Sequence, residues 1–191
     1  MAKINSEKMK KLFILMLILT FHLSIMAQDQ PAIASEKNVI KLNTLSLLVG
    51  TGSVFYERRI TDMISGQLGV SYMDFSLFTD TKFSGLIINP ECKFYIRKNA
   101  IDGFYFSPYL RYHRFAVENK EESSSGSLSS FGGGVAFGRQ WIYKKGFVFD
   151  LFFGGHYGKS KVKVDSGTDS FDKDLFNGFK IRAGAAIGFA F

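Results

Sequence analysis

Residues 179–191 read FKIRAGAAIGFAF, and this stretch decides the fold class of the chain. Every second side chain from Phe179 to Phe191 is apolar, while the residues between them are small or cationic, as at Lys180 and Arg182. Such alternation indicates a β-strand, because successive side chains of a strand point to opposite faces. A tilted strand needs about nine to eleven residues to cross a membrane, whereas strands of soluble sheets usually have about five or six. The stretch therefore predicts the closing strand of an outer-membrane β-barrel.

The beginning of the chain has the features of a secretory signal. Basic residues at Lys8, Lys10 and Lys11 precede an apolar run over 12–23, and a small residue at Ala27 offers a cleavage site before Gln28. The run is shorter than the roughly 20 apolar residues that a membrane-spanning helix needs. We therefore predict a signal peptide over 1–27, a short periplasmic lead-in over 28–37 and one barrel domain over 38–191.

Strand-like alternation recurs through the rest of the chain. The upper half of the first run is ambiguous, and Pro90 indicates a bulge in the fourth, since proline removes a ladder donor. The eight predicted strands are Asn38–Val49, Ser53–Ile60, Ser65–Met73, Ser84–Arg97, Phe104–Val117, Leu128–Tyr143, Phe147–Gly158 and Phe179–Phe191.

Three regularities favour a membrane barrel over a soluble one. The connections after the second, fourth and sixth runs are short and those after the third, fifth and seventh are long, as in outer-membrane barrels. Aromatic residues stand at strand ends, where interfacial girdles form. The less apolar faces are rich in glycine, which suits the narrow, side-chain-filled interior of an eight-stranded barrel. A soluble lipocalin-like barrel is the alternative, and it would turn its apolar faces inward. The prediction is an all-β, eight-stranded, antiparallel up-and-down transmembrane β-barrel.

Four segments carry a resemblance to a known group of proteins. They are residues 38–43 (NVIKLN), 56–58 (YER), 132–142 (GGGVAFGRQWI) and the terminal Phe191. With the export signal, they make the chain resemble the small eight-stranded outer-membrane barrels of the outer-membrane protein A/X type, and more closely the uncharacterised barrels of this size in Bacteroidetes. The resemblance implies insertion by the barrel-assembly machinery, which reads the last strand. Here the apolar residues of that assembly signal are Phe179, Ile181, Ile187, Phe189 and Phe191.

The phase of each strand places a set of charges inside the barrel. Charges in a narrow, low-dielectric lumen must be paired or hydrated. One interpretation is a structural plug of ion pairs, and the alternative is a narrow pore that prefers anions, since bases outnumber acids. The predicted lumen cluster comprises Lys41, Glu57, Glu91, Lys93, Arg97, Arg111, Asp150, Lys180 and Arg182.

A lipid A-modifying enzyme is a third hypothesis, because His113 and His156 also face inward by phase. A catalytic triad needs its base within hydrogen-bond reach of the nucleophile. Ser107 is six residues from His113, or about 20 Å along a strand, and Ser160 lies in the predicted loop beyond His156. Neither forms a compact motif, so we predict no enzyme, and the single cysteine, Cys92, and the histidines have no metal-ligand spacing. We expect neither a metal nor a cofactor.

The net charge and the composition of the loops limit the classes of partner that the protein could bind. Residues 1–27 contain four lysines and Glu7, so the net charge falls from +7 to +4, which is too small and too scattered for nucleic-acid binding. The predicted loop over 159–177 alternates lysines with aspartates, and it is either a solvated loop or a contact with lipopolysaccharide. We expect a monomeric protein of the Gram-negative outer membrane with a structural or surface-interaction role, surrounded by outer-membrane lipid and lipopolysaccharide.

Overall fold

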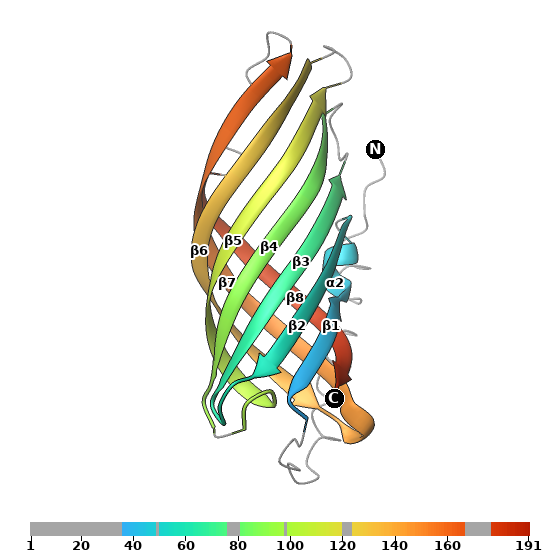
Figure 1. Ribbon diagram of the computed structural model, residues 1–191, viewed down its shortest axis with the longest axis vertical. Coiled ribbons are helices and arrows are strands. Elements are labelled where there is room, and N and C mark those ends of the chain that lie inside the picture. The colour runs from blue at the N-terminus through green and yellow to red at the C-terminus, as the bar shows by residue number, and fades with distance from the viewer. Residues whose placement is uncertain (1–35, 49, 76–80, 98, 120–123, 167–176) are drawn as a thin grey trace, which may run out of the picture. The chain divides into compact units, whose positions relative to one another are not determined.

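The described part of the chain is a closed barrel in which every strand pairs with its neighbours in sequence, and β1 pairs with β8 (Figure 1). This computed structural model describes residues 36–48, 50–75, 81–97, 99–119, 124–166 and 177–191. All eight pairings are antiparallel. The predicted eight-stranded antiparallel barrel is confirmed. The predicted signal peptide and most of the lead-in fall in 1–35, outside the described residues.

The elements follow one another with few interruptions. In chain order they are β1 (Asn38–Asn43), α2 (Thr44–Leu47), β2 (Thr51–Arg59), β3 (Ile64–Phe75), β4 (Thr81–Tyr95), β5 (Gly103–Asn119), β6 (Ser124–Ile142), η1 (Lys144–Gly146), β7 (Phe147–Ser166) and β8 (Gly178–Ala190).

Burial alternates along the strands in the phase that the sequence indicates. In β2, for example, Phe55 and Glu57 are buried whereas Val54 and Tyr56 are exposed. In β8, Arg182, Gly184 and Ala186 face inward, and the apolar residues between them face outward. The outward faces therefore form an apolar belt, and the polar and charged side chains line the interior.

Several strand boundaries differ from the prediction. β1 ends at Asn43 and not at Val49, because α2 begins at Thr44. β7 continues to Ser166, into the segment 159–177 that we expected to be a loop. β5 and β6 extend until only 120–123 separates them, so the long loop predicted after the fifth strand is wrong. Backbone pairing continues there, as at Asn119 and Ser124, because a hairpin can propagate along serine- and glycine-rich strands without an apolar face.

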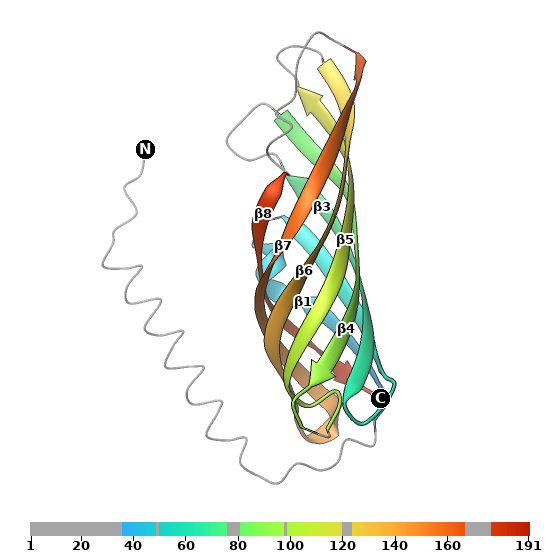
Figure 2. The same cartoon turned by 90° about the vertical axis from the view of Figure 1, so that its left-hand side faces the viewer.

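The barrel wall is uneven in height. β5, β6 and β7 have 17, 19 and 20 residues, but β1 and β2 have only 6 and 9. Figure 2 shows β7 rising above the upper end of β8, whose first residue, Gly178, pairs with Gly158. The end of the barrel that carries the C-terminus has short connections, including the predicted tight turn at η1, where Lys145 and Gly146 have φ values of 66° and 81°.

Candidate functional site

The connection between β4 and β5 folds over the C-terminal end of the lumen. Ile101 is fully buried with a φ of 75°, and it belongs to an apolar cluster with Val39, Val148 and Ala190. The Gln140 side chain donates a hydrogen bond to the Ile101 carbonyl at 2.8 Å. This end of the barrel is therefore filled by side chains from four strands and a turn.

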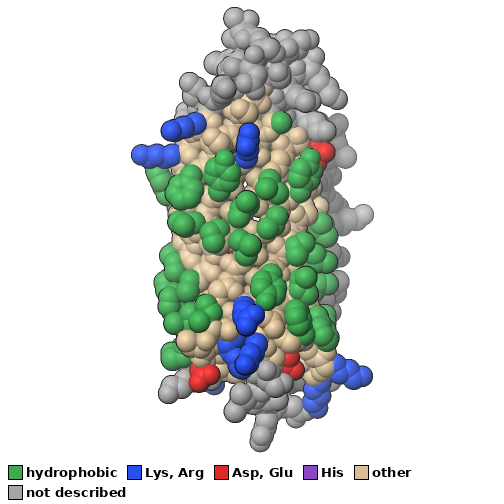
Figure 3. All heavy atoms as spheres, viewed as in Figure 1, with side chains coloured by type: hydrophobic (Ala, Val, Ile, Leu, Met, Phe, Trp, Pro, Cys, Tyr) green, Lys and Arg blue, Asp and Glu red, His purple; other side chains and the backbone are tan. Residues whose placement is uncertain are grey.

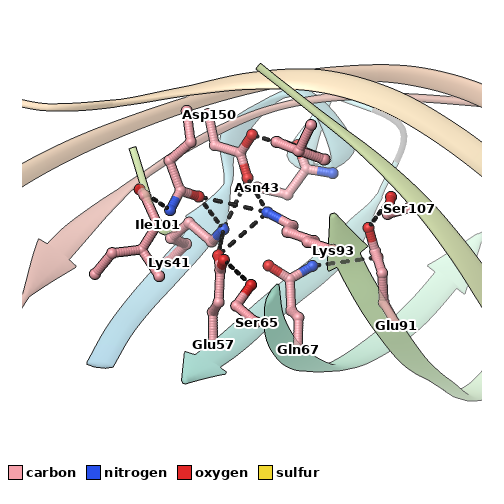
Figure 4. A network of polar contacts seen from close by, with 12 residues as sticks. Lys41, Asn43, Glu57, Ser65, Gln67, Glu91, Lys93, Ile101, Ser107 and Asp150 are labelled. Carbon is pink, nitrogen blue, oxygen red and sulfur yellow. Dashed lines mark hydrogen bonds and ion pairs between the residues drawn. The ribbon is translucent and has the colours of Figure 1, made fainter. Parts of the chain in front are cut away.

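Two lysines and two carboxylates meet near Ile101 (Figure 4). Lys41 Nζ lies 2.7 Å from both Glu57 Oε2 and Asp150 Oδ2. Lys93 Nζ lies 3.2 and 3.0 Å from the same two oxygens. All four side chains are almost completely excluded from solvent. We call these four residues the charge quartet; its formal charges cancel, which satisfies the requirement that buried charges be paired.

Neutral side chains complete the hydrogen bonding of the charge quartet. The second oxygen of Glu57 accepts hydrogen bonds from Ser65 at 2.6 Å and Tyr95 at 2.7 Å. The second oxygen of Asp150 accepts one from Tyr105 at 2.7 Å. Gln140 Oε1 accepts from both lysines. Each carboxylate oxygen therefore has at least one donor, and a network satisfied in this way is rigid.

A second charged pair lies farther along the lumen. Arg182 Nη2 donates to Glu91 Oε2 at 2.9 Å, and Ser107 donates to the other Glu91 oxygen at 2.7 Å. The guanidinium carbon of Arg182 lies 4.3 Å from the Tyr109 ring centroid and 4.8 Å from that of Phe152. Arg182 is thus held by an ion pair and by two aromatic faces, a geometry suited to its planar, delocalised charge.

On the side of Glu91 away from the charge quartet, positive side chains outnumber negative ones in the described interior. Arg111 donates from Nε to His113 Nε2, and no carboxylate pairs with it among the described residues. His156 lies beside Tyr109, with Nδ1 3.3 Å from the hydroxyl oxygen, and it pairs across strands with Lys180. Around Glu91 and on its side away from the charge quartet, the described interior positions therefore carry three cations, Arg111, Lys180 and Arg182, against one carboxylate.

Glycines on neighbouring strands make room for the large interior side chains. A Cβ atom added at Gly138 would meet the ring of Tyr105, and one added at Gly184 would meet the ring of Phe152. These contacts explain why the inward faces alternate between glycine and bulky residues, because the lumen of an eight-stranded barrel holds little more than its own side chains.

The predicted lumen residues thus fall into distinct groups. Lys41, Glu57, Lys93 and Asp150 form the quartet, and Glu91 pairs with Arg182. Arg111 and Lys180 lie on inward positions without a carboxylate partner in the described part. Arg97 was assigned wrongly: β4 ends at Tyr95, so strand phase no longer applies at position 97, and its side chain is exposed.

The sequence interpretation omitted four residues of the network, namely Ser65, Tyr95, Tyr105 and Gln140. All have the inward phase, so alternation placed them on the lumen side. Charge was used to select the cluster, and these side chains are neutral. A search for hydroxyl and amide groups on the inward faces would have found them.

The residues considered for catalysis have other partners. Ser107 donates to Glu91 and to the Ala136 carbonyl, and the Ser160 hydroxyl donates to Asn177. His113 and His156 lie beside each other, with ring centroids 6.2 Å apart. Across the described ranges, no three His, Cys, Asp or Glu side chains gather as a metal site would require.

The face of the barrel drawn in Figure 3 carries a band of apolar side chains with lysines and arginines toward both ends. Phe104, near the start of β5, and Phe191, directly after β8, are exposed on this surface; Tyr157 is exposed as well but lies within β7 and not at its end. The residues of the predicted assembly signal, Phe179, Ile181, Ile187, Phe189 and Phe191, are all exposed as well. No helix in the described ranges combines the length and hydropathy needed to cross a bilayer.

Comparison with models of known protein families assigns the chain to one family. A family model described as "Protein of unknown function (DUF3575)" matches residues 12–165. The chain belongs to the DUF3575 family. The match to DUF3575 ends before β8. Among curated proteins, none matches the sequence.

Solved structures of other barrels resemble this DUF3575 member at low sequence identity. The N-terminal β-barrel domain of Pseudomonas aeruginosa OprF is 13% identical with a TM-score of 0.46, covering 82% of this chain and 98% of that one. Acinetobacter baumannii CarO2 is 11% identical with a TM-score of 0.44 and the same coverage. A major outer membrane protein from Thermus thermophilus is 13% identical with a TM-score of 0.49, covering 82% of this chain and 99% of that one.

Proposed function

We propose that this protein is a monomeric barrel of the Gram-negative outer membrane whose lumen is closed by its own side chains. Its role is structural or interactive at the cell surface, and it does not act as a channel. The exposed apolar belt supports the membrane location, because such a surface is unfavourable in water and matches the hydrocarbon region. Export after removal of residues 1–27 and insertion by the barrel-assembly machinery belong to the same proposal.

One observation carries the proposal of a closed lumen: the charge quartet is fully buried and neutral as a group. Opening a water-filled path would require the separation of four ion pairs and of the hydroxyl donors bonded to them. The buried side chains of Val39, Ile101, Val148 and Ala190 form an apolar cluster that adds to the closure. Among the described residues, the interior therefore has no continuous set of groups that could replace an ion's hydration shell.

Single-channel recording in planar bilayers tests the closed lumen. We expect the purified, folded protein to give no discrete conductance steps. The Lys93→Ala variant removes one of the two lysines of the charge quartet. Conductance steps in this variant would measure the leakage that occurs when the quartet is weakened. Reproducible steps from the wild-type protein would overturn the proposal.

A narrow pore that prefers anions is the second candidate. The specific observation in its favour is the excess of Arg111, Lys180 and Arg182 over Glu91 in the interior. If conductance steps occur, a reversal potential in a salt gradient measures their selectivity. Anion preference that falls in Arg111→Gln would support this candidate over the closed barrel.

A further inference from the structure

The barrel seam between β1 and β8 is incomplete on the side away from the C-terminus. β1 pairs with Ala186–Ala190 only, through its residues Val39–Asn43. β8 begins at Gly178, and β7 pairs with it from Gly178 to Phe189. Within the described part of the chain, the segment from Gly178 to Ala185 therefore has a strand on one side only. We call this segment the open edge.

The sequence explains why β1 stops. Outward positions of β1 include Ile40 and Leu42, so an extended chain would next place Thr44 and Ser46 toward lipid and Leu45 and Leu47 toward the lumen. A shift of one residue in the apolar pattern reverses the two faces, and a half-buried strand does not tolerate this. The chain forms α2 at this point, and Leu47 is 60% exposed.

The backbone of the open edge has a defined direction. The N–H and C=O groups of Phe191 pair with Asn38, on the β1 side. Those of Ala185 also point to this side, because its N–H donates to Asn43 Oδ1 at 3.3 Å and its carbonyl accepts from Thr44 Oγ1 at 2.8 Å. Alternate residues of a strand share this direction. Phe179, Ile181 and Ala183 therefore present their backbone N–H and C=O groups to the side where no described strand pairs with them.

Unpaired backbone groups are costly in hydrocarbon, because no water is present there to hydrogen-bond them. The open edge lies in the apolar belt, since the side chains of Phe179 and Ile181 are each 68% exposed. A second copy inserted in the same orientation does not cover the edge by strand pairing. Two β8 strands related by an axis along the membrane normal would run in parallel and cross at twice their tilt of about 40°.

Cationic side chains stand directly behind the open edge. Lys180 and Arg182 belong to it and face the interior, and Arg111 lies near Arg182. Arg182 is only 6% exposed, and its Nη1 has no hydrogen-bond partner in the described part. Arg182 Nη1, together with the edge N–H groups that no described strand pairs with, supplies donors without an acceptor in the described part, and Arg111 and Lys180 add positive charge beside them. Such donors bind oxyanions strongly through charge-assisted hydrogen bonds.

The outer side of the open edge could hold the acyl chain of a lipid whose head group lies at the height of Lys180 and Arg182. Phe179 and Ile181 offer an apolar surface, with Leu47 exposed on α2. Tyr157 pairs with Phe179. The next outward residue of β7 is Lys159, which is exposed. Its charge marks the upper limit of the apolar belt on this strand. An oxyanion next to a hydrocarbon chain is the chemistry of an anionic lipid.

We propose that the open edge of β8 binds an anionic lipid of the surrounding leaflet. Its phosphate accepts hydrogen bonds from the edge N–H groups and from the interior cations, and its acyl chain lies against Ile181 and Leu47. The inference rests on the proposed membrane location. It does not depend on whether the lumen conducts.

Native mass spectrometry of the folded protein tests the site. The protein is released from mixed micelles that contain equal amounts of phosphatidylglycerol and phosphatidylcholine with identical acyl chains. We expect retained phosphatidylglycerol to exceed phosphatidylcholine by roughly tenfold, as charge-assisted bonds predict. Arg111→Gln combined with Lys180→Gln should abolish most of this preference. Neither residue pairs with a carboxylate in the described part, so their replacement leaves Glu91 with its Arg182 partner.

The matched control is Lys159→Gln with Lys161→Gln, which removes the same charge from the exposed outer face of β7. We expect this variant to keep its preference for phosphatidylglycerol. An equal loss in both double variants would overturn the site in favour of general surface attraction, and so would equal retention of both lipids by the wild type. Release as a lipid-free dimer would also contradict the proposal, because it would identify a second copy as the occupant.

A second variant covers the edge without removing charge. Thr44→Leu, Leu45→Thr, Ser46→Leu and Leu47→Ser together restore the outward apolar phase and allow β1 to continue along β8. This variant should lose the retained phosphatidylglycerol, and its gel mobility before boiling shows whether it is folded. Undiminished retention by the folded variant would overturn the proposal. If the proposed membrane location were wrong, no folded, detergent-resistant barrel would be obtained. That outcome can be distinguished from a folded barrel that does not retain the lipid.

Discussion

At the scale of single residues, the interior is organised by the charge quartet. Lys41 contacts Glu57, Asp150 and Gln140, which come from three other strands. A buried ion pair adds little net stability over an apolar substitute, but removal of one member leaves an uncompensated charge. Lys41 therefore stabilises the fold mainly by compensating the buried charges of Glu57 and Asp150.

We predict that Lys41→Met lowers the free energy of unfolding by about 3–5 kcal/mol, since Glu57 and Asp150 would share Lys93 alone. Urea unfolding from lipid vesicles measures the change. Lys145→Met, at an exposed turn, should change stability by less than about 0.5 kcal/mol. Lys41→Met combined with Asp150→Asn removes one charge of each sign and should cost less than Lys41→Met alone; an equal or larger cost would show that charge imbalance is not the cause.

At the scale of elements, β8 combines two faces with different tasks. The residue that follows it, Phe191, accepts backbone hydrogen bonds from Lys37 and Asn38 and donates one to Asn38, which closes the seam. The inward face of β8 supplies Arg182 to the ion pair with Glu91. The outward apolar residues contribute nothing to that pair, so assembly and interior packing are separable properties of one strand.

We predict that deletion of Phe191 impairs barrel assembly and leaves export intact, because the seam loses its terminal hydrogen bonds and the last apolar residue of the strand. The measurement is the fraction of exported protein that becomes resistant to protease in the outer membrane. Arg182→Gln should assemble nearly as well as the wild type, since Glu91 keeps its bond from Ser107. Equal failure of both variants would show that the two faces are not independent.

At the scale of the whole molecule, closure pairs most strand edges. Among the described residues, the open edge of β8 and the part of β7 beyond Gly158 have a strand on one side only. Closed barrels have all backbone groups paired between strands, which makes them resistant to detergent. The lumen is packed at the C-terminal end by the Ile101 cluster and the charge quartet, and it is cationic beyond Glu91. The molecule is thus closed at one end and has its excess interior charge toward the other.

We predict heat-modifiable mobility for the protein from the membrane fraction. An unboiled sample in dodecyl sulfate should migrate apart from a boiled one, because the paired barrel does not unfold until heated. Gel electrophoresis of fractionated cells measures both the shift and the location. A freely soluble protein with the same mobility before and after boiling would contradict the membrane assignment.

The number of strands, their inward and outward faces and the glycine-lined interior could all be predicted from the amino-acid sequence. Alternation with a period of two is a local property, so it is readable without knowledge of the neighbours. It also identified Lys41, Glu57, Lys93 and Asp150 as interior charges. It failed at Arg97, where the strand had already ended, and at the upper half of the first strand, where the apolar pattern reverses its phase.

Which interior residues contact one another depends on the arrangement of all the strands around the barrel. Lys41 and Asp150 are 109 positions apart, and their contact depends on the register of every pairing around the barrel. The phase of a strand fixes the face on which a side chain lies, but not its height in the lumen or its neighbours there. For the same reason the open edge of β8 could not be read from β8, whose alternation is unbroken: it exists because a different strand, β1, ends early.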